Sequence, residues 1–148
     1  MYKKPKRKSI SKKKREIIKA KFNGKCAYCG IELTRMHVDH VIPHEYFPQH
    51  ILNKWQPDFL SHLGVDDLDH MDNYFPSCPV CNAAKYTFSV KGFKREMQKQ
   101  AVRAKKTSRN YRLSLKYGLI IETDVKIKFY FEDFIVDGKL ILDENEKV

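Results

Sequence analysis

Two pairs of cysteines constrain the fold of this chain more than any other feature of its sequence. They are Cys26-Ala27-Tyr28-Cys29 and Cys78-Pro79-Val80-Cys81, and each pair can present two thiolates from one tight turn to a tetrahedral ion. Simple zinc ribbons place such pairs about 15 to 20 residues apart, whereas here the gap is far longer. Because loop-closure entropy grows only logarithmically with length, one shared site can still form, with a sizeable segment folded into the interval.

The four cysteines have two interpretations besides a metal site, namely two disulfides or thioredoxin-like redox pairs. The N-terminal run MYKKPKRKSISKKKR carries charge with no apolar run behind it, unlike a secretory signal peptide. We therefore expect an intracellular protein, cytoplasmic or nucleoid-associated and not secreted, whose thiols stay reduced unless a metal binds them. Structural zinc is the favoured interpretation. Because sulfur would fill all four positions, this metal would hold the fold and perform no hydrolysis.

Length and charge limit the class of protein. The 148 residues suit one ordinary domain, which we place at residues 11–148 behind a basic, disordered tail of residues 1–10. Lysine and arginine number 29 against 18 acidic residues, a net charge of +11, and such an excess favours a polyanion such as nucleic acid as partner. No stretch approaches the roughly 20 apolar residues of a membrane span, so no membrane partner is expected.

The first half of the chain predicts a helix followed by a strand. Residues 11–24 show helical spacing of apolar residues between a serine that can cap the start and a glycine that can end the helix. Residues 36–42 have strand-forming character and end at Pro43, which cannot donate to a sheet ladder. Asp39 and His40 are therefore expected near the end of a strand.

The second half predicts an insertion, a basic helical region and a hairpin. Residues 43–72 carry several acids and an apolar set that indicates a small core of its own. Residues 89–117 show one apolar stripe at helical spacing, with lysines and arginines on the other face. In residues 126–142, two apolar runs flank Asp137-Gly138, which is typical of a two-residue hairpin turn. Helices and short strands together indicate an α+β fold.

A further set of residues stands between and beside the cysteines in a definite order. Val38-Asp39-His40-Val41-Ile42-Pro43 comes first, then Asn73, then Cys81-Asn82-Ala83-Ala84-Lys85. Together with the two C-x-x-C pairs, this order resembles the four-cysteine branch of the HNH endonucleases over roughly residues 22–90. The resemblance implies a ββα-metal finger clamped by a four-cysteine zinc site. The flanking helices, the helical insertion and the C-terminal β-hairpin predicted above would be added to that finger.

The resemblance also implies roles for four residues. His40 would be the general base and Asn73 would orient it. Asp39 and Asn82 would bind a catalytic divalent cation. An imidazole with a pKa near 6.5 can take a proton from water while it is largely neutral beforehand, and carboxylate and amide oxygens are hard ligands that suit magnesium or manganese. The alternative interpretation, a surface Asp–His pair and two capping asparagines, is disfavoured because the residues occur together.

Several basic side chains are candidates for nucleic-acid contacts. Lys85 lies one turn beyond Asn82 on the same helix face, and His37 precedes Asp39 by two residues. The basic helical region contributes Lys91, Lys94 and Arg95. Phosphate contacts of this kind bring affinity with a steep salt dependence but no base specificity. The alternative is a set of solvated charges.

The sequence therefore predicts a metal-dependent endonuclease that hydrolyses DNA phosphodiester bonds, with structural zinc and catalytic magnesium or manganese. The alternatives are a non-catalytic zinc-finger protein that binds nucleic acid and an RNA-cleaving HNH nuclease, since nothing in the chain reads the 2′-hydroxyl of RNA. Restriction, homing, phage-genome processing and junction resolution all stay open as roles. A homodimer, with the hairpin of residues 126–142 as interface, would let one site per chain cut both strands.

Overall fold

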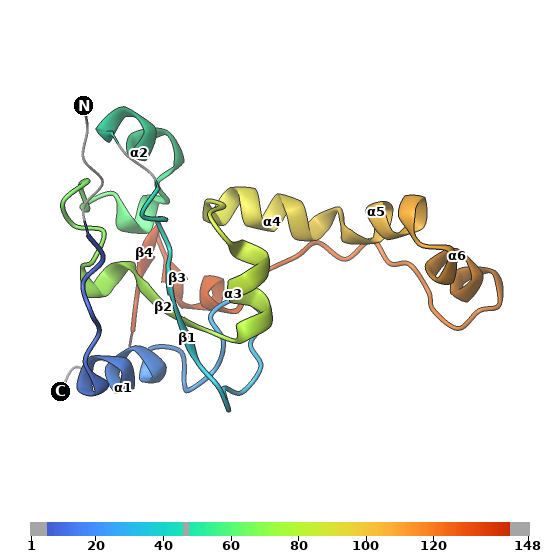
Figure 1. The fold of residues 1–148 in the computed structure, drawn as a ribbon, viewed down its shortest axis with the longest axis horizontal. Helices are drawn as coiled ribbons and strands as arrows, with labels where there is room; N and C mark the ends of the chain where they lie inside the picture. Colours follow the sequence, from blue (N-terminus) through green and yellow to red (C-terminus); the bar gives the residue numbers. More distant parts are fainter. Residues whose placement is uncertain (1–5, 46–47, 143–148) are drawn as a thin grey trace.

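A two-stranded antiparallel sheet carries the middle of the sequence motif. The computed structural model describes residues 6–45 and 48–142. Strand β1 (His37–His40) pairs with β2 (Tyr74–Ser77), and their register sets His40 opposite Tyr74. Helix α3 (Pro79–Lys85) follows β2 and packs against β1 (Figure 1). The combination of helices with small sheets confirms the α+β class.

Local sequence signals explain where two helices begin. Ser11 caps α1 (Lys12–Ala20), because its side-chain oxygen accepts a hydrogen bond from a backbone N–H of the first turn. The helix predicted up to Gly24 ends earlier, and Gly24 itself has a φ of 72°, which a helix cannot contain. Cys78 caps α3 through its sulfur, and Pro79 takes the first helical position, where no N–H is needed. The second cysteine pair thus also starts a helix.

The described residues between the two strands contain one short α-helix and two 3-10 turns: α2 (Gln49–Trp55), η1 (Asp58–Leu60) and η2 (Met71–Asn73). The separate small core predicted for residues 43–72 is wrong for the part of this segment that is described. Its buried leucines join the same cluster as Phe75 of β2, and Phe59 stacks on that ring with centroids 5.9 Å apart. So short a segment buries its apolar side chains most fully against an existing core.

The hairpin predicted for residues 126–142 forms only around its turn. A 3-10 helix comes first and two short strands follow: η3 (Tyr130–Phe134), β3 (Ile135–Val136) and β4 (Lys139–Leu140). Asp137 and Gly138 both have positive φ, as a type I′ turn requires. Upstream, the N–H of Phe131 donates to the carbonyl of Ala27 at 2.8 Å. This bond holds the segment against the first cysteine pair, so these residues do not form the strand that the sequence predicts.

The basic helical region of residues 89–117 is divided into three helices: α4 (Val90–Gln98), α5 (Gln100–Thr107) and α6 (Arg109–Lys116). Helix α4 packs through its buried Phe93 on the core around β1 and β2. We call this part of the molecule the body. Helices α5 and α6, which we call the arm, contain no buried residue and extend away from the body (Figure 1). In the described part of the chain, no helix has the length and apolar character that crossing a membrane requires.

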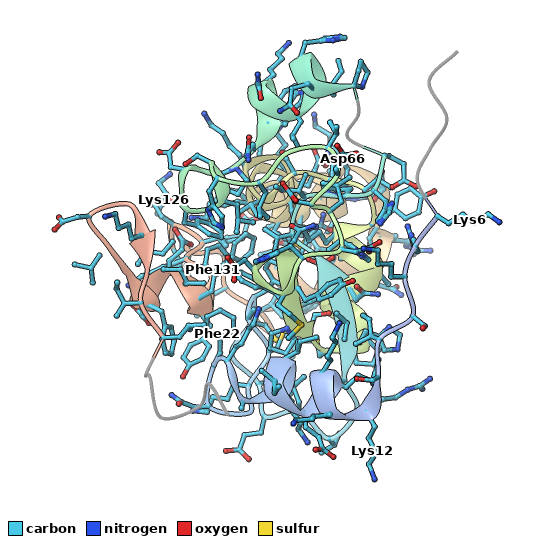
Figure 2. All side chains as sticks on the ribbon, turned by 90° about the vertical axis from the view of Figure 1, so that its left-hand side faces the viewer. Lys6, Lys12, Phe22, Asp66, Lys126 and Phe131 are labelled. Carbon is cyan, nitrogen blue, oxygen red and sulfur yellow. The ribbon has the colours of Figure 1, made fainter. Side chains whose placement is uncertain are left out.

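Aromatic rings fill the centre of the body. Phe22, just beyond α1, meets the ring of Phe75 edge-on at 4.9 Å, and Phe131 packs on Phe75 at 5.1 Å. In Figure 2 Phe22 and Phe131 lie inside the molecule, whereas Lys6 and Lys12 point outward. Phe75 and Phe131 also pack on the ring of Tyr28, which stands inside the first cysteine pair. The core therefore fixes the strands and the cysteines relative to one another.

Candidate active site

The four cysteines come together, as the sequence predicts. Their sulfur atoms all lie within 4.8 Å of one another, and none of the four forms a disulfide. The sulfurs of Cys29 and Cys78 are 3.9 Å apart, nearly twice the roughly 2.05 Å of a disulfide bond. A hydrogen bond from Cys81 lowers the pKa of Cys26 to about 4, although burial opposes this shift. The cluster thus supplies a thiolate, which is the form of cysteine that binds metal ions.

Asp39 is buried on β1 between two donors. The hydroxyl of Tyr28 donates to its Oδ2, and Nζ of Lys85 donates to its Oδ1 at 3.2 Å. Burial raises the pKa of Asp39 and lowers that of Lys85, while the charge of each residue opposes the shift of the other. Tyr28 stands inside the first cysteine pair, and Lys85 ends the helix that starts at the second pair. Each cysteine pair therefore helps to position one of the two side chains that donate to this carboxylate.

The prediction that Lys85 contacts substrate phosphate is wrong. Its side chain is 0% exposed, and Nζ donates to Asp39 and, at 2.9 Å, to the backbone carbonyl of His40. An unpaired ammonium is strongly unfavourable in a protein interior, so the lysine turns inward only because a carboxylate compensates its charge there. Lys85 has an internal role, which is to join α3 to two adjacent residues of β1.

His40 is held by a carboxylate that sequence reasoning missed. Its Nε2 lies 2.9 Å from Oδ1 of Asp69, and the same oxygen lies 3.0 Å from Nε2 of His44 and 3.1 Å from the hydroxyl of Tyr74. Burial raises the pKa of Asp69, but the hydrogen bonds outweigh it and hold that pKa well below its ordinary range. Burial also lowers the pKa of His40, although the hydrogen bond that its ring donates to Asp69 opposes this shift. The imidazole is thus fixed in place and neutral at neutral pH.

Asp69 and His44 escaped the sequence analysis for different reasons. Asp69 is one of several acids in the insertion, and no motif spacing distinguishes it from its neighbours. His44 follows His40 by four residues, a spacing that places two side chains on one face within a continuous helix or strand, but the backbone here leaves the strand after His40 and turns. The fold of the insertion, which the sequence pattern did not predict, brings the two side chains together.

Asn73 does not contact the ring of His40, in contrast to the role predicted for it. Its Oδ1 accepts from the N–H of Ile42 at 2.7 Å, and its Nδ2 donates to the carbonyls of Ile42 at 3.0 Å and Leu68 at 2.8 Å. The buried amide satisfies both polar groups of one residue, two positions beyond His40. Asn73 therefore fixes the backbone of the loop that follows β1, and Asp69 orients the imidazole instead.

Three of the predicted residues reach one cleft. Asp39, His40 and Asn82 line a cavity of about 420 Å³, together with Arg7. The amide nitrogen of Asn82 lies 3.2 Å from Nδ1 of His37, and this contact leaves the amide oxygen as the atom that can face a cation. His37, which the sequence predicts as a nucleic-acid contact, thus lies beside Asn82.

The described part of the predicted basic tail runs past this cleft. Of residues 1–10, the first five lie outside the described residues. The backbone N–H of Lys8 donates to Oδ2 of Asp69 at 3.1 Å, and Arg7 approaches Glu45 at 3.8 Å while it lines the cleft. This end of the tail is thus attached to the site.

The side chains predicted to contact phosphate on the basic helical region lie on α4, and none of them lines that cleft. Lys91 and Arg95 are exposed. Lys94 donates to Glu132 at 2.5 Å and lies over the ring of Phe129 at 5.5 Å, so its charge is already engaged within the protein. A contact between these residues and nucleic acid stays a prediction.

Comparisons with known proteins agree with the motif. The chain is 31% identical over 68 residues to the SPbeta prophage-derived putative HNH endonuclease YoqL of Bacillus subtilis (strain 168). The match covers 46% of this chain and 26% of that relative, so it spans about a quarter of the relative's length. No family model and no solved structure matches the chain. The relative and the four-cysteine cluster confirm the resemblance to the HNH endonucleases.

Proposed function

We propose that this chain is a metal-dependent HNH endonuclease that hydrolyses the phosphodiester bonds of DNA. The observation that carries the proposal is the convergence of Asp39, His40 and Asn82 on one cleft, next to a cluster of four cysteines. The name of the prophage relative supports a nuclease function in general, and the net charge of +11 suits a polyanionic substrate.

We infer that the four cysteines hold zinc and that β1, β2 and α3 form a ββα-metal finger. The donor set fits this ion, because four sulfurs within 4.8 Å suit a tetrahedral metal and Cys26 already has a low pKa. With sulfur in every position, zinc would support the fold and leave no place for a reacting water. Because Cys81 directly precedes Asn82, the same ion would fix the first turn of α3 beside the cleft.

Asp39 and Asn82 would hold the catalytic cation, magnesium or manganese. Their donor atoms fit a hard cation: Asp39 is a carboxylate whose ionised form is stabilised by Lys85, and the amide nitrogen of Asn82 is engaged with His37. Two protein ligands suffice, because such cations keep waters and substrate oxygens in their other positions. When bound, the cation would stabilise the negative charge that develops on the phosphate and on the leaving oxygen.

His40 would act as the general base. A carboxylate partner requires a proton on Nε2, so the bond to Asp69 leaves the lone pair of the ring on Nδ1. Nδ1 takes a proton from water while the water oxygen bonds to phosphorus and the bond from phosphorus to the leaving sugar oxygen breaks. The lowered pKa of His40 keeps the ring neutral and able to accept that proton.

Two basic surfaces would hold the nucleic acid near the cleft. One is the exposed face of α1, and the other is the arm together with Lys91 and Arg95 of α4. Exposed lysines and arginines contact phosphates in any sequence, so these surfaces supply affinity and leave base specificity to other contacts.

Incubation of the chain with supercoiled plasmid tests the proposal. With magnesium we expect nicked circles, and with a chelator we expect none. His40→Ala should slow nicking by a factor of about 10² to 10⁴, the range for removal of a general base, in a variant that circular dichroism shows to be folded at the assay temperature. His62→Ala is the matched control, because His62 is an exposed histidine that is also paired with an aspartate, Asp72. It should cut at the wild-type rate.

Two outcomes would favour the alternatives. If no divalent ion supports nicking although the chain retards plasmid in a gel, the chain is a non-catalytic nucleic-acid binding protein. If it cuts single-stranded or structured RNA and leaves the plasmid intact, it is an RNA-cleaving nuclease.

A further inference from the structure

We propose that His40, His44 and Asp69 form a further metal site, which takes a transition metal such as zinc and which inactivates the proposed general base when it is occupied. The three ligand atoms all lie within 4.8 Å of one another. Both histidines direct Nε2 at the same carboxylate oxygen, at 2.9 and 3.0 Å. The metal-binding part of the proposal rests on this geometry alone, whereas the inhibitory part rests on the proposed function.

The donor set separates this site from the other two. Two imidazole nitrogens and one carboxylate oxygen suit zinc, cobalt, nickel or copper, whereas magnesium prefers oxygen ligands alone. Asp39 and Asn82 offer two oxygens, and the cysteine cluster offers four sulfurs. Each set therefore selects a different class of ion.

The fold brings Asp69 from a distant part of the chain to two histidines that are four residues apart, and it holds all three ligands. His40 ends β1, His44 stands in the loop after Pro43, and Asp69 precedes η2. Their side chains are 15%, 1% and 8% exposed, so they are not a chance meeting of surface groups. The hydroxyl of Tyr74 and the N–H of Lys8 orient the carboxylate, as groups around a metal ligand commonly do. The cleft reaches both histidines, which gives an ion a route in and room for water.

A second group of the same composition serves as a contrast. His62 and His70 both approach Asp72, at 2.8 and 3.6 Å, but all three side chains are at least half exposed. Their orientations are not fixed by burial, and they do not converge as a ligand cluster. This group provides a matched negative control.

Occupation of the site would change the protonation of His40. A metal on Nε2 takes the lone pair of that nitrogen, so in the neutral ring the proton moves from Nε2 to Nδ1. Nδ1 then has no lone pair to accept a proton from water. His44 would undergo the same shift, and its Nδ1, which has no hydrogen-bond partner in the described structure, would become a buried donor without an acceptor. This unfavourable group lowers the affinity of the site, so we expect weaker binding here than of zinc at four thiolates.

Cobalt(II) titration of the full chain tests the site without any activity assay. The cysteine cluster is first loaded with one zinc per chain, and excess magnesium saturates the oxygen donors of the cleft. We expect one cobalt to bind per chain, with the absorption of a nitrogen and oxygen environment and without a thiolate charge-transfer band. Wild-type protein that binds no cobalt under these conditions would overturn the proposal.

Substitutions then assign the ligands. His44→Gln and Asp69→Asn should each lose the bound cobalt while the cysteine-bound zinc stays at one per chain, and His62→Gln should keep it. Retention of cobalt by both His44→Gln and Asp69→Asn would also overturn the site. Because Asp69 is less buried than His44, Asp69→Asn decides the matter if His44→Gln does not fold.

Inhibition is measured separately. In excess magnesium, added zinc should slow plasmid nicking by the wild type, and His44→Gln should be less sensitive when each protein is compared with its own uninhibited rate. Equal sensitivity would refute the inhibitory role. If the wild type does not nick at all, the proposed function fails, while the cobalt count still decides whether the site exists.

Discussion

The body around β1 and the arm use ionisable side chains in opposite ways. In the body, Asp39, Lys85 and Asp69 are largely withdrawn from solvent, and each is bonded to a specific partner. In the arm no residue is buried. Its basic side chains are all exposed: Arg103, Lys105, Lys106, Arg109, Arg112 and Lys116.

This difference separates a geometry-dependent region from a charge-dependent one. A buried ionised group needs its partner at a fixed position, since the cost of desolvation returns in full when the partner is removed. An exposed charge contributes little to stability even where it is paired, as Lys105 is with Glu122, so it can exchange that partner for a phosphate. The body should therefore be sensitive to single substitutions, and the arm should respond mainly to its total charge.

Loss of the metal cluster is the largest effect that distinguishes the two regions. Cys78→Ser removes one of four sulfurs, and structural zinc contributes on the order of 10 kcal/mol to the folding of small zinc domains. We expect the variant to release zinc and to lose its cooperative melting transition, as measured by metal analysis and circular dichroism. Arg109→Ser in the arm is the control and should keep both. Equal melting curves for the wild type and Cys78→Ser would refute the structural-zinc assignment.

A comparison of two lysines tests the contrast at the level of single residues. Lys85→Met leaves the carboxylate of Asp39 buried without its cation, and breaking a buried pair in this way costs about 3 to 5 kcal/mol of unfolding free energy. Lys91→Met makes the same change on the exposed face of α4 and should alter the free energy by less than about 0.5 kcal/mol. Urea denaturation measures both values. Similar losses in the two variants would mean that Lys85 is not the compensating charge of the body.

The local parts of the candidate site could be predicted from the sequence. The cysteine pairs, Asp39, His40 and Asn82 lie in short motifs in which the neighbouring residues determine the geometry: a knuckle, a strand that ends at a proline, and the first turn of a helix. Such motifs keep their shape wherever the chain places them.

The roles of Asp69, Asn73 and Lys85 could not be predicted, because they depend on burial and on the path of the insertion. Nothing in the spacing of Lys85 indicates whether it turns toward solvent or toward Asp39. The division of the basic helical region has a tertiary cause as well. The side chain of Gln98 bonds to the backbone of Val125 and Ile127 in the returning chain, and the helix breaks directly after it.

Neutralising charges in the arm should weaken DNA binding and leave the body intact. If Lys106 and Arg109 each contact one phosphate, the double substitution to Gln lowers the slope of log K against log salt by about 2 and the affinity by about thirtyfold at 0.15 M salt. Fluorescence anisotropy with duplex DNA at several salt concentrations measures both. The matched control replaces Lys128 and Lys139, which are exposed in the acidic C-terminal part, and should keep the wild-type slope. An unchanged slope in the arm variant would locate the phosphate contacts elsewhere, with α1 as the next surface to test.

The smallest expected effect is on the pH dependence of stability. It should come from the body, which contains His40, and not from the arm, which contains no histidine. Burial lowers the pKa of His40 below its unfolded value near 6.5, so the unfolded chain binds more protons than the folded one in this range. The free energy of unfolding should therefore be highest above pH 6.5 and should decrease as the pH falls through the folded pKa. His40→Gln should flatten this slope in urea titrations, whereas the arm double variant should retain it. If the wild type were instead more stable at pH 5.5 than at pH 7, His40 would be bound as a cation to Asp69 and would be unable to take a proton from water.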